Sequence, residues 1–327
     1  ICEIVCPGVL LLGEVVMAPE KVVPYFGTVE KPECHLLYNV TTMASTWHTV
    51  ATKDVSLLRR QLDIISELPR DYVFQNYLRC HDDIGWGLDY EYLENFGIQE
   101  VPHKKYLNDF LTGKYPDSFA RGELYNDDPR LGDARLCGTT ASLCGIERFG
   151  FEGNQEGVDR AVRYDITLHA FMLSQSGIPV IYSGDEIGQV NDYSYKDDPE
   201  KSDDSRYLHR GKFDWKLAEN RHDPATVQGK LFPVLDKLEH IRSSHGIFNS
   251  NVPIHTIDTW DNSILAFVRE NDEEKFIGIY NFSENDKVAW INEEDGMYTD
   301  LISGREMEAK GVQIPAFGCY WLCRNKQ

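Results

Sequence analysis

The chain has few positive charges for its length. It carries 33 lysines and arginines against 53 aspartates and glutamates, which leaves a formal net charge of −20 over 327 residues. A protein whose main partner is nucleic acid or an anionic membrane surface presents basic patches, and nothing in this sequence balances the acidic excess. The composition therefore argues against nucleic acid and membrane partners and favours a neutral substrate.

The cysteines are scattered along the chain. Eight cysteines are present, with no pair of Cys-x-x-Cys motifs and no histidine-rich cluster at zinc spacing, so we expect no metal and no cofactor. Scattered cysteines are typical of reduced thiols, which predicts a cytoplasmic location. Cys319 and Cys323 fall on one face of an apolar run, where buried free thiols are expected.

The apolar opening of the chain, residues 1–12, is too short to span a membrane and lacks the basic start of a secretory signal. It begins without methionine and leads at once into a buried-type segment. We therefore expect the chain to be a fragment that begins in the middle of a domain.

The order of apolar segments predicts a parallel α/β arrangement. Four short runs have the composition of buried strands, and helical periods separate the second from the third and the third from the fourth. Strand, loop, strand, helix, strand is the order of a parallel barrel or wound sheet. The predicted strands cover residues 9–16, 34–39, 72–78 and 177–182, and the predicted helices cover 43–68, 157–175 and 229–243.

The rest of the chain differs in character. Residues after Trp86 show no clear period over a length too great for an ordinary connection, which indicates an inserted subdomain. After about residue 250 the pattern changes to short strands over 263–268, 276–282, 287–291 and 318–322, which predict an antiparallel β domain. The predicted divisions are a half-barrel over 1–85, an insertion over 86–150, the barrel end over 151–250 and a β-sandwich over 251–327.

Charged groups follow the predicted strands directly. His81, Asp82 and Asp83 end the third strand, Glu14 ends the first, and Asp185 with Glu186 end the fourth. In a (β/α)8 barrel the carboxyl ends of the strands form the catalytic face. A cluster of carboxylates at that face is typical of a site for carbohydrate chemistry.

These features together resemble the α-amylase superfamily of retaining glycosidases and transglycosidases, and within it amylosucrase and its relatives. The stretches that carry the resemblance are Gly13-Glu14-Val15-Val16, Asn76-Tyr77-Leu78-Arg79-Cys80-His81-Asp82-Asp83-Ile84-Gly85-Trp86, Ile181-Tyr182-Ser183-Gly184-Asp185-Glu186, Lys201-Ser202-Asp203-Asp204-Ser205-Arg206 and Arg221-His222-Asp223-Pro224. The resemblance implies a partial (β/α)8 barrel that comprises strands five to eight.

The resemblance also implies roles for individual residues. Glu14 would be the general acid/base, and His81 with Asp82 would hold the sugar hydroxyls and stabilise the transition state. Asp83 would face the acceptor subsite, and Arg221 would help to close the glucosyl pocket. Arg79 and Trp86, in the same motif as Asp82, are taken as further substrate-binding residues.

One part of the family pattern is missing. The nucleophile of the family is an aspartate in an Arg-x-Asp-Ala strand, and no such strand occurs here. Arg163-Tyr164-Asp165-Ile166 imitates it but falls inside the predicted helix over 157–175. Retaining cleavage needs two carboxyl groups about 5 Å apart, so this chain alone is expected to be inactive.

Structural interpretations compete with several of these roles. Glu14 could form a structural salt bridge, although partial desolvation in its apolar run favours a carboxyl group that can donate a proton. Asp82 could cap a helix, but no helix follows promptly. Asp185 and Glu186 could serve only to anchor a loop. The aspartates at 197, 198, 203 and 204 lack EF-hand spacing and are expected at a solvated rim or in a substrate loop.

Three functions stay open on the sequence alone. The leading one is amylosucrase-like transfer of glucose from sucrose to an α-glucan or to water. The second is a hydrolase of maltooligosaccharides on the same fold. The third is a non-catalytic carbohydrate-binding protein, which the missing nucleophile favours.

Overall fold

A computed structural model describes residues 2–15, 17, 19–28, 30–128, 133–291 and 296–326. Val16, the last residue of the first predicted strand, lies outside these ranges, as do the chain ends at residues 1 and 327. Within the described part of the chain, no helix is both long enough and apolar enough to cross a bilayer. The cytoplasmic location stays a prediction.

The four predicted apolar strands form one parallel sheet in the order β1-β2-β3-β6. The strands are short, and their bounds are Leu12–Gly13 (β1), Leu36–Tyr38 (β2), Val73–Asn76 (β3) and Ile178–Pro179 (β6). Gly177 precedes β6 with a φ of 111°, and a Cβ there would lie 2.2 Å from the carbonyl oxygen of Phe74. Only glycine allows this close approach of the two strands.

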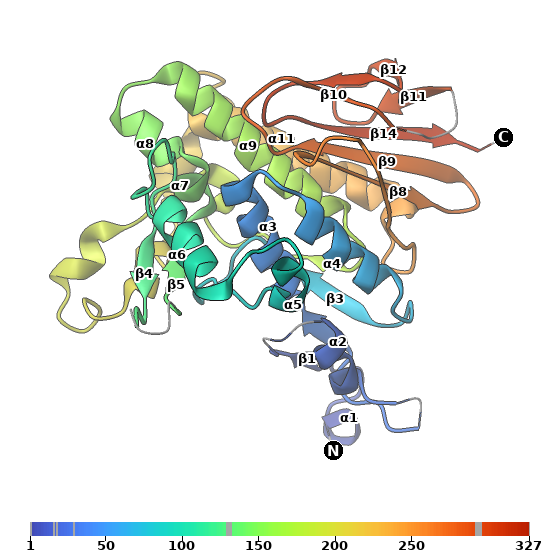
Figure 1. Cartoon of the computed structure of the whole chain (residues 1–327), viewed down its shortest axis with the longest axis horizontal. Helices are drawn as coiled ribbons and strands as arrows, with labels where there is room; N and C mark the ends of the chain where they lie inside the picture. The colour runs from blue at the N-terminus through green and yellow to red at the C-terminus, as the bar shows by residue number, and fades with distance from the viewer. Residues whose placement is uncertain are drawn as a thin grey trace.

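The helices of the first half cover this sheet and build the insertion (Figure 1). In chain order they are α1 Cys2–Val5, α2 Pro19–Val22, η1 Val23–Phe26, α3 Val40–Thr52, α4 Ser56–Ser66, α5 Tyr90–Glu94, α6 Glu100–Leu111, α7 Thr140–Cys144 and α8 Ile146–Phe151. The insertion also holds an antiparallel hairpin of β4 Glu123–Tyr125 and β5 Arg135–Cys137. On α3, Trp47 is fully buried and donates from Nε1 to the carbonyl oxygen of Leu78, 2.7 Å away.

The single helix predicted over 43–68 is wrong, because it divides into α3 and α4 at Lys53. This residue ends α3 with a φ of 60°. Its Nζ donates to the carbonyl oxygen of Val50 at 2.6 Å and lies 4.7–5.4 Å from the centres of four aromatic rings, those of Phe110, Phe119, Tyr164 and Phe317. Contact with these rings offsets part of the cost of the left-handed backbone and of the buried ammonium group.

The second half begins with a long helix, α9, over Gln155–Ser174, as predicted. Asp165 lies inside it and pairs with His169 one turn later, so it does not end a strand. The polar segment over 191–224 is not an open loop, since it folds into short helices whose N-caps are aspartates such as Asp192, Asp204 and Asp214. The short helices within this segment are η3 Tyr193–Asp197, η4 Ser205–His209, α10 Trp215–Ala218 and η5 Glu219–His222. The helix η2 Asp185–Ile187 precedes the segment, and α11 Val227–Ser244 and η6 Gly246–Phe248 follow it.

The C-terminal part is antiparallel, as predicted. Six strands lie in the order β12-β11-β14-β9-β8-β7, and β10 pairs separately with β13. Their bounds are β7 His255–Ile257, β8 Ile264–Glu270, β9 Glu274–Asn281, β10 Lys287–Ala289, β11 Met297–Asp300, β12 Glu306–Glu308, β13 Val312–Ile314 and β14 Cys319–Asn325. Strands β7, β11, β12 and β13 were not predicted, because they are three or four residues long and partly polar.

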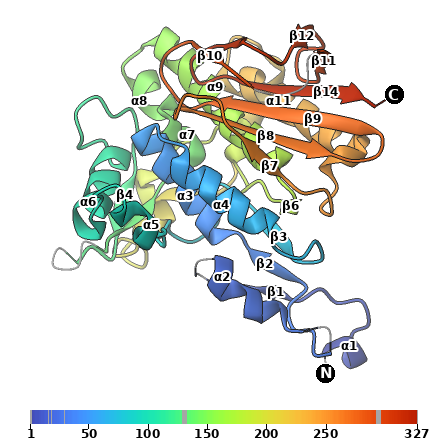
Figure 2. The ribbon, with the colours of Figure 1, turned by 45° about the vertical axis from the view of Figure 1, so that its right-hand side comes forward.

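The largest hydrophobic cluster of the described residues joins the first half of the chain to the C-terminal sheet, and three smaller clusters are separate from it. Its buried members include Trp47 on α3, Leu107 on α6, Phe171 on α9, Phe276 on β9 and Trp321 on β14. In both ribbon views α9 and α11 lie along the C-terminal sheet (Figures 1 and 2). The chain divisions proposed from the sequence stay predictions, and packing between the insertion, the helices and the C-terminal sheet is continuous.

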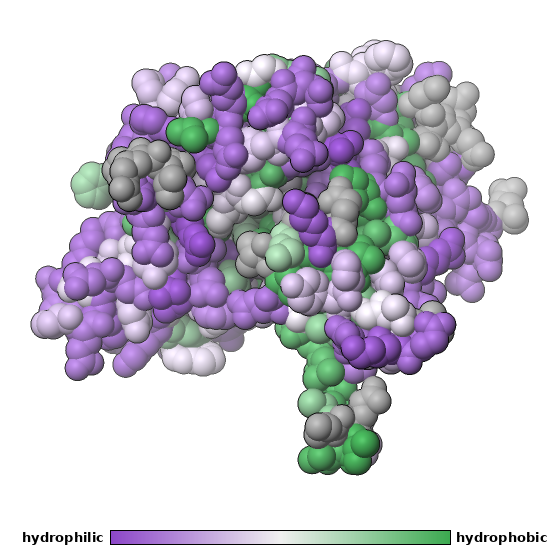
Figure 3. All heavy atoms as spheres, turned by 60° about the horizontal axis from the view of Figure 1, so that its bottom comes forward, coloured by the Kyte–Doolittle hydropathy of each residue, from purple (hydrophilic) through white to green (hydrophobic). Residues whose placement is uncertain are grey.

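The N-terminal residues lie outside this core. They project from the body together with β1 and α2 (Figure 2), and much of the projecting surface is apolar (Figure 3). Its large exposed hydrophobic side chains are Ile4, Val5, Leu10, Leu12 and Met17. On the opposite edge of the sheet, Ile178 and Val180 are exposed as well. Both edges of the parallel sheet are therefore open to further packing.

Truncation of Phe171 tests the core. The residue is fully buried on α9, so we expect Phe171→Ala to lower the free energy of unfolding by about 3–5 kcal/mol. Phe151→Ala is the matched control, because Phe151 is 94% exposed and its loss should cost less than about 0.5 kcal/mol. Urea denaturation followed by circular dichroism measures both, and equal midpoints for the two variants would contradict the assignment of the core.

Candidate active site

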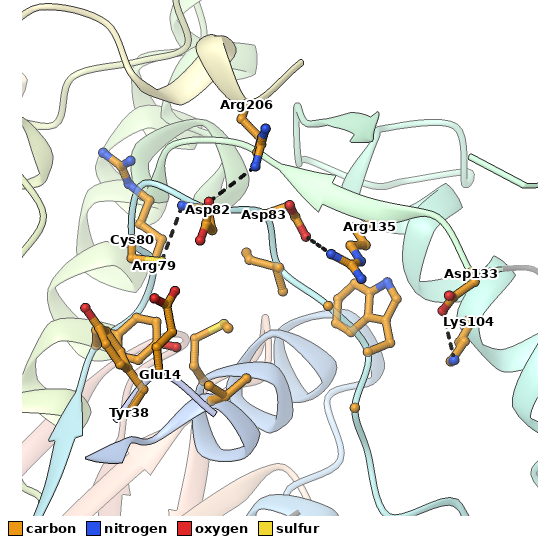
Figure 4. A pocket seen from close by; sticks show the side chains of 17 residues that line it. Glu14, Tyr38, Arg79, Cys80, Asp82, Asp83, Lys104, Asp133, Arg135 and Arg206 are labelled. Carbon is orange, nitrogen blue, oxygen red and sulfur yellow. Dashed lines mark hydrogen bonds and ion pairs between the residues drawn. The ribbon is translucent and has the colours of Figure 1, made fainter. Parts of the chain in front are cut away.

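A cavity of about 320 Å³ lies at the carboxyl end of the parallel sheet. Glu14 follows β1, Tyr38 ends β2, and the segment from Arg79 to Trp86 follows β3. All of these residues except His81 line the cavity (Figure 4). Strands in a parallel sheet end at the same edge, which is why residues so far apart in sequence meet here. Of the predicted site residues, Glu14, Arg79, Asp82, Asp83 and Trp86 border this cavity.

Glu14, His81 and Asp82 form a compact group. One side-chain donor or acceptor atom from each lies within 4.8 Å of the others. His81 Nε2 is 3.5 Å from Asp82 Oδ2. The Glu14 side chain is exposed rather than partly buried, so the desolvation expected from its apolar run is not observed. The reason is that β1 is an edge strand with β2 as its only neighbour in the described sheet.

Residues 205–210, η4 and the arginine after it, fold over the turn at His81 and Asp82. Arg206 Nη1 and Arg210 Nη2 lie 3.4 Å and 3.3 Å from Asp82 Oδ1. Arg210 Nε also donates to the carbonyl oxygen of His81 at 2.5 Å. Asp82 accepts no hydrogen bond from a helix N-terminus in the described structure, and the helix after it, α5, is capped by Asp89. This arrangement favours a site role for Asp82 over helix capping.

His209 supports the same turn from behind. Its Nδ1 accepts from the backbone N–H of Gly138 at 3.0 Å, and its Nε2 lies 3.3 Å from the carbonyl oxygen of His81. Burial, and next the charge of Arg79, lowers the pKa of His209 to about 3. The imidazole is therefore neutral, with the proton on Nε2, where it can donate to His81.

Arg79 belongs to the wall of the cavity rather than to its interior. Its Nε donates to both carboxylate oxygens of Asp185, at 2.8 Å and 3.1 Å, and both side chains are 2% exposed. Its Nη1 donates to the carbonyl oxygen of His209, and its guanidinium stacks 4.4 Å from the ring centre of Tyr182. These contacts favour the anchoring interpretation of Asp185 and leave Arg79 few donors for a substrate.

Two further predicted residues hold the far side of the cavity. Asp83 lies 3.4 Å from Arg135 Nη1. Trp86 is 5% exposed, and its Nε1 donates to Asn108 Oδ1 at 2.7 Å. The indole is thus fixed in the core with little surface for a sugar to stack on. The burial of Trp86 does not favour the predicted stacking role, which stays a prediction.

Arg221 is not brought to this cavity. It lies on η5, where Nη1 donates to the carbonyl oxygen of Ala218 and the guanidinium faces the ring of Phe232. In the predicted role Arg221 pairs with an aspartate near the start of the barrel. Its closing role stays a prediction.

Several cavity residues were missed on the sequence. Lys104, Asp133, Arg135 and Arg206 line the cavity from the insertion and from η4. Arg206 sits in the Asp-Asp-Ser-Arg stretch that the resemblance already includes, so the motif could have indicated it. Lys104, Asp133 and Arg135 come from a region without a motif, and only the fold of α6 and of the hairpin brings them there.

The chain is similar to several known proteins. No family model matches the chain. Glucosylglycerate phosphorylase of Escherichia coli is 25% identical over 324 residues, which cover 98% of this chain and 54% of that protein. Trehalose synthase of Thermus thermophilus is 27% identical over 183 residues, 56% of this chain and 15% of that enzyme. The solved structure of a sucrose 6F-phosphate phosphorylase from Thermoanaerobacter thermosaccharolyticum has a TM-score of 0.61 at 17% identity, over 93% of this chain and 52% of its own.

These similarities indicate the α-amylase superfamily.

Within the superfamily, the amylosucrase-like subtype is not confirmed, since the similar proteins include phosphorylases and a trehalose synthase. The α-amylase of H. orenii shares the fold with a TM-score of 0.55 at 16% identity, over 99% of this chain and 55% of its own. The chain therefore spans about half the length of the superfamily members that it matches. The assignment of its parallel strands as barrel strands five to eight remains a proposal.

The ion pair of Arg79 and Asp185 generates a stability prediction. Arg79→Met leaves the buried Asp185 carboxylate without its partner, which should lower the free energy of unfolding by about 3–5 kcal/mol. The double variant Arg79→Met/Asp185→Leu should recover part of that loss, because it also removes the buried charge. Lys31→Met breaks the exposed pair with Glu33 and should cost less than about 1 kcal/mol. Chemical denaturation checks the set, and a double variant no more stable than Arg79→Met would argue against the pairing.

Acid should destabilise the fold through its buried histidines. Burial, and next the neighbouring His103, lowers the pKa of His48 to about 3. Below the unfolded-state pKa of about 6.5, His48 binds a proton in the unfolded chain but stays neutral in the folded chain. The free energy of unfolding therefore falls as the pH drops from 6.5 toward 3. His48→Leu should reduce this slope by about 1.4 kcal/mol per pH unit. Unfolding curves between pH 4 and 7, with exposed His255→Gln as control, measure it; an unchanged slope in His48→Leu would refute the assignment.

Proposed function

We propose that this chain forms the acid/base half of an active site that transfers α-glucosyl groups with retention. Glu14 is the general acid/base and Asp82 stabilises the transition state, with His81 beside it. The observation that carries the proposal is the approach of Glu14, His81 and Asp82 to within 4.8 Å of one another at the carboxyl end of a parallel sheet. One sugar ring in the cavity can contact all three.

The chemistry follows from the surroundings of each group. Glu14 is at the solvent-exposed mouth of the cavity, where it can protonate a departing oxygen and then accept a proton from an incoming acceptor. Asp82 is held by Arg206 and Arg210, so its carboxylate keeps one orientation as positive charge grows on the sugar. The nucleophile is supplied outside this chain in the proposal.

Phosphate is the acceptor that we favour. The supporting observation is the similarity to proteins named as glucosylglycerate phosphorylases, over 98% of this chain for the one from Escherichia coli and 75% for the one from Spirochaeta thermophila. The reaction would then move glucose from an α-glucoside to phosphate. The second candidate is the amylosucrase reaction, with sucrose as the donor. It rests on the motif over residues 76–86 and on Arg221.

The carboxylates test the proposal in a full-length protein that contains this chain. We expect Glu14→Gln to slow glucosyl transfer by about 10²–10⁴-fold, because it removes the proton donor. Asp82→Asn should slow it by about 10²–10³-fold, because it weakens the stabilisation of the transition state. Asp236→Asn, at an exposed position on α11, is the matched control and should leave the rate within twofold. Folded variants that keep full activity would overturn both roles.

Product analysis separates the candidate reactions. Glucose 1-phosphate formed only with phosphate present indicates phosphorolysis, and fructose released from sucrose without phosphate indicates the amylosucrase reaction. Glucose released from maltooligosaccharides indicates the hydrolase. Sugar binding without turnover of any donor would favour the non-catalytic alternative and contradict the proposal.

A further inference from the structure

A second group of ligating side chains lies far from the cavity. His245 ends α11, Glu274 begins β9 and Cys323 lies in β14. One nitrogen, one oxygen and one sulfur atom from these residues lie within 4.8 Å of one another. We propose that His245, Glu274 and Cys323 form a zinc site that fastens the last helix of the barrel part to the C-terminal sheet.

The distance between the sulfur and the carboxylate oxygen fits a tetrahedral ion. Zinc bonds of about 2.0–2.3 Å place neighbouring ligand atoms roughly 3.3–3.8 Å apart. Cys323 Sγ is 3.8 Å from Glu274 Oε1. His245 Nδ1 is 2.5 Å from the same oxygen, so an ion inserted between them replaces this hydrogen bond and requires a separation of about 1 Å more.

The backbone prepares the carboxylate for this role. The N–H of Ile247 lies 3.3 Å from Glu274 Oε2, which leaves Oε1 directed at the other two ligands. Glu274 and Cys323 are on adjacent strands in fixed register, since Cys323 pairs with Phe276. A hydrogen bond to the outer carboxylate oxygen is the usual means of orienting a metal ligand.

Charge and burial select the ion. Cys323 is 5% exposed, and the Glu274 side chain is 11% exposed. A divalent ion with one thiolate, one carboxylate and a neutral imidazole makes a site of zero net charge, which can be buried at low cost. Binding breaks the S–H bond of Cys323 and releases its proton to water. A thiolate with an imidazole favours zinc over magnesium or calcium.

A metal ion can reach the site from the side of His245, whose side chain is 29% exposed. Three protein ligands leave a fourth position on that side for water. The sequence spacing gives no zinc motif, because the ligands are separated by 29 and 49 positions and come from a helix end and two strands. The expectation of no metal, drawn from motif spacing, could not have detected such a site.

Cobalt(II) tests the proposal in the 327-residue chain with exposed Cys2 and Cys6 changed to serine. We expect one Co²⁺ per chain with a thiolate-to-cobalt absorption band. Cys323→Ser should abolish the band, and His245→Ala should weaken binding by about 100-fold or more. The matched control Cys319→Ser, four residues earlier in β14, should keep both band and affinity.

Zinc provides an independent readout should Cys323→Ser fail to fold. Zinc should raise the unfolding midpoint of the parent protein and of Cys319→Ser but not that of His245→Ala, because an ion that binds only the folded state stabilises it. A band that persists in Cys323→Ser, or cobalt bound without any band, would overturn the proposal. The latter result would place the metal elsewhere, such as at Glu14, His81 and Asp82, a group that has no thiol.

Discussion

The buried ion pair of Arg79 and Asp185 joins the segment after β3, which lines the cavity, to the segment after β6. Arg79 follows β3 and Asp185 follows β6, and Thr140 of the insertion adds a hydrogen bond to Asp185 at 3.0 Å. Two charges removed from water need precise geometry to be tolerated, so the pair fixes the insertion and both strand ends together. The turn at His81 and Asp82 begins two residues after Arg79 and takes its position from this pair.

The same pair brings η4 to the turn. Arg79 donates to the backbone of His209, and His209 and Arg210 then contact the carbonyl oxygen of His81. The part of the site that holds Asp82 is therefore rigid and built by residues distant in sequence. Glu14, in contrast, stands on an exposed edge strand with few neighbours. The proposed transition-state group is fixed by the fold, and the proposed proton donor is the freer partner.

The sequence predicts what depends on local pattern. Strands with charged ends, such as the segment that leads to His81 and Asp82, were correctly located, because apolar runs and strand termini leave a clear signal. The expectation that all four are buried is wrong for β1 and β6, which are edge strands with exposed residues. Lys53 was not recognised as a helix break, since its left-handed backbone depends on rings from residues up to 317. The partnership of Arg79 with Asp185, across 106 positions, is likewise invisible before the strands are paired.

The unbroken core has a consequence for protein engineering. Trp47, Phe171 and Trp321 belong to the same packed cluster. The predicted division at 250/251 would separate Trp321 from the other two. A truncation there would strip an apolar layer from α9 and expose it to water. The C-terminal sheet should therefore not fold well when it is transferred alone to another scaffold. Circularly permuted chains should keep the sheet joined to α9 and α11.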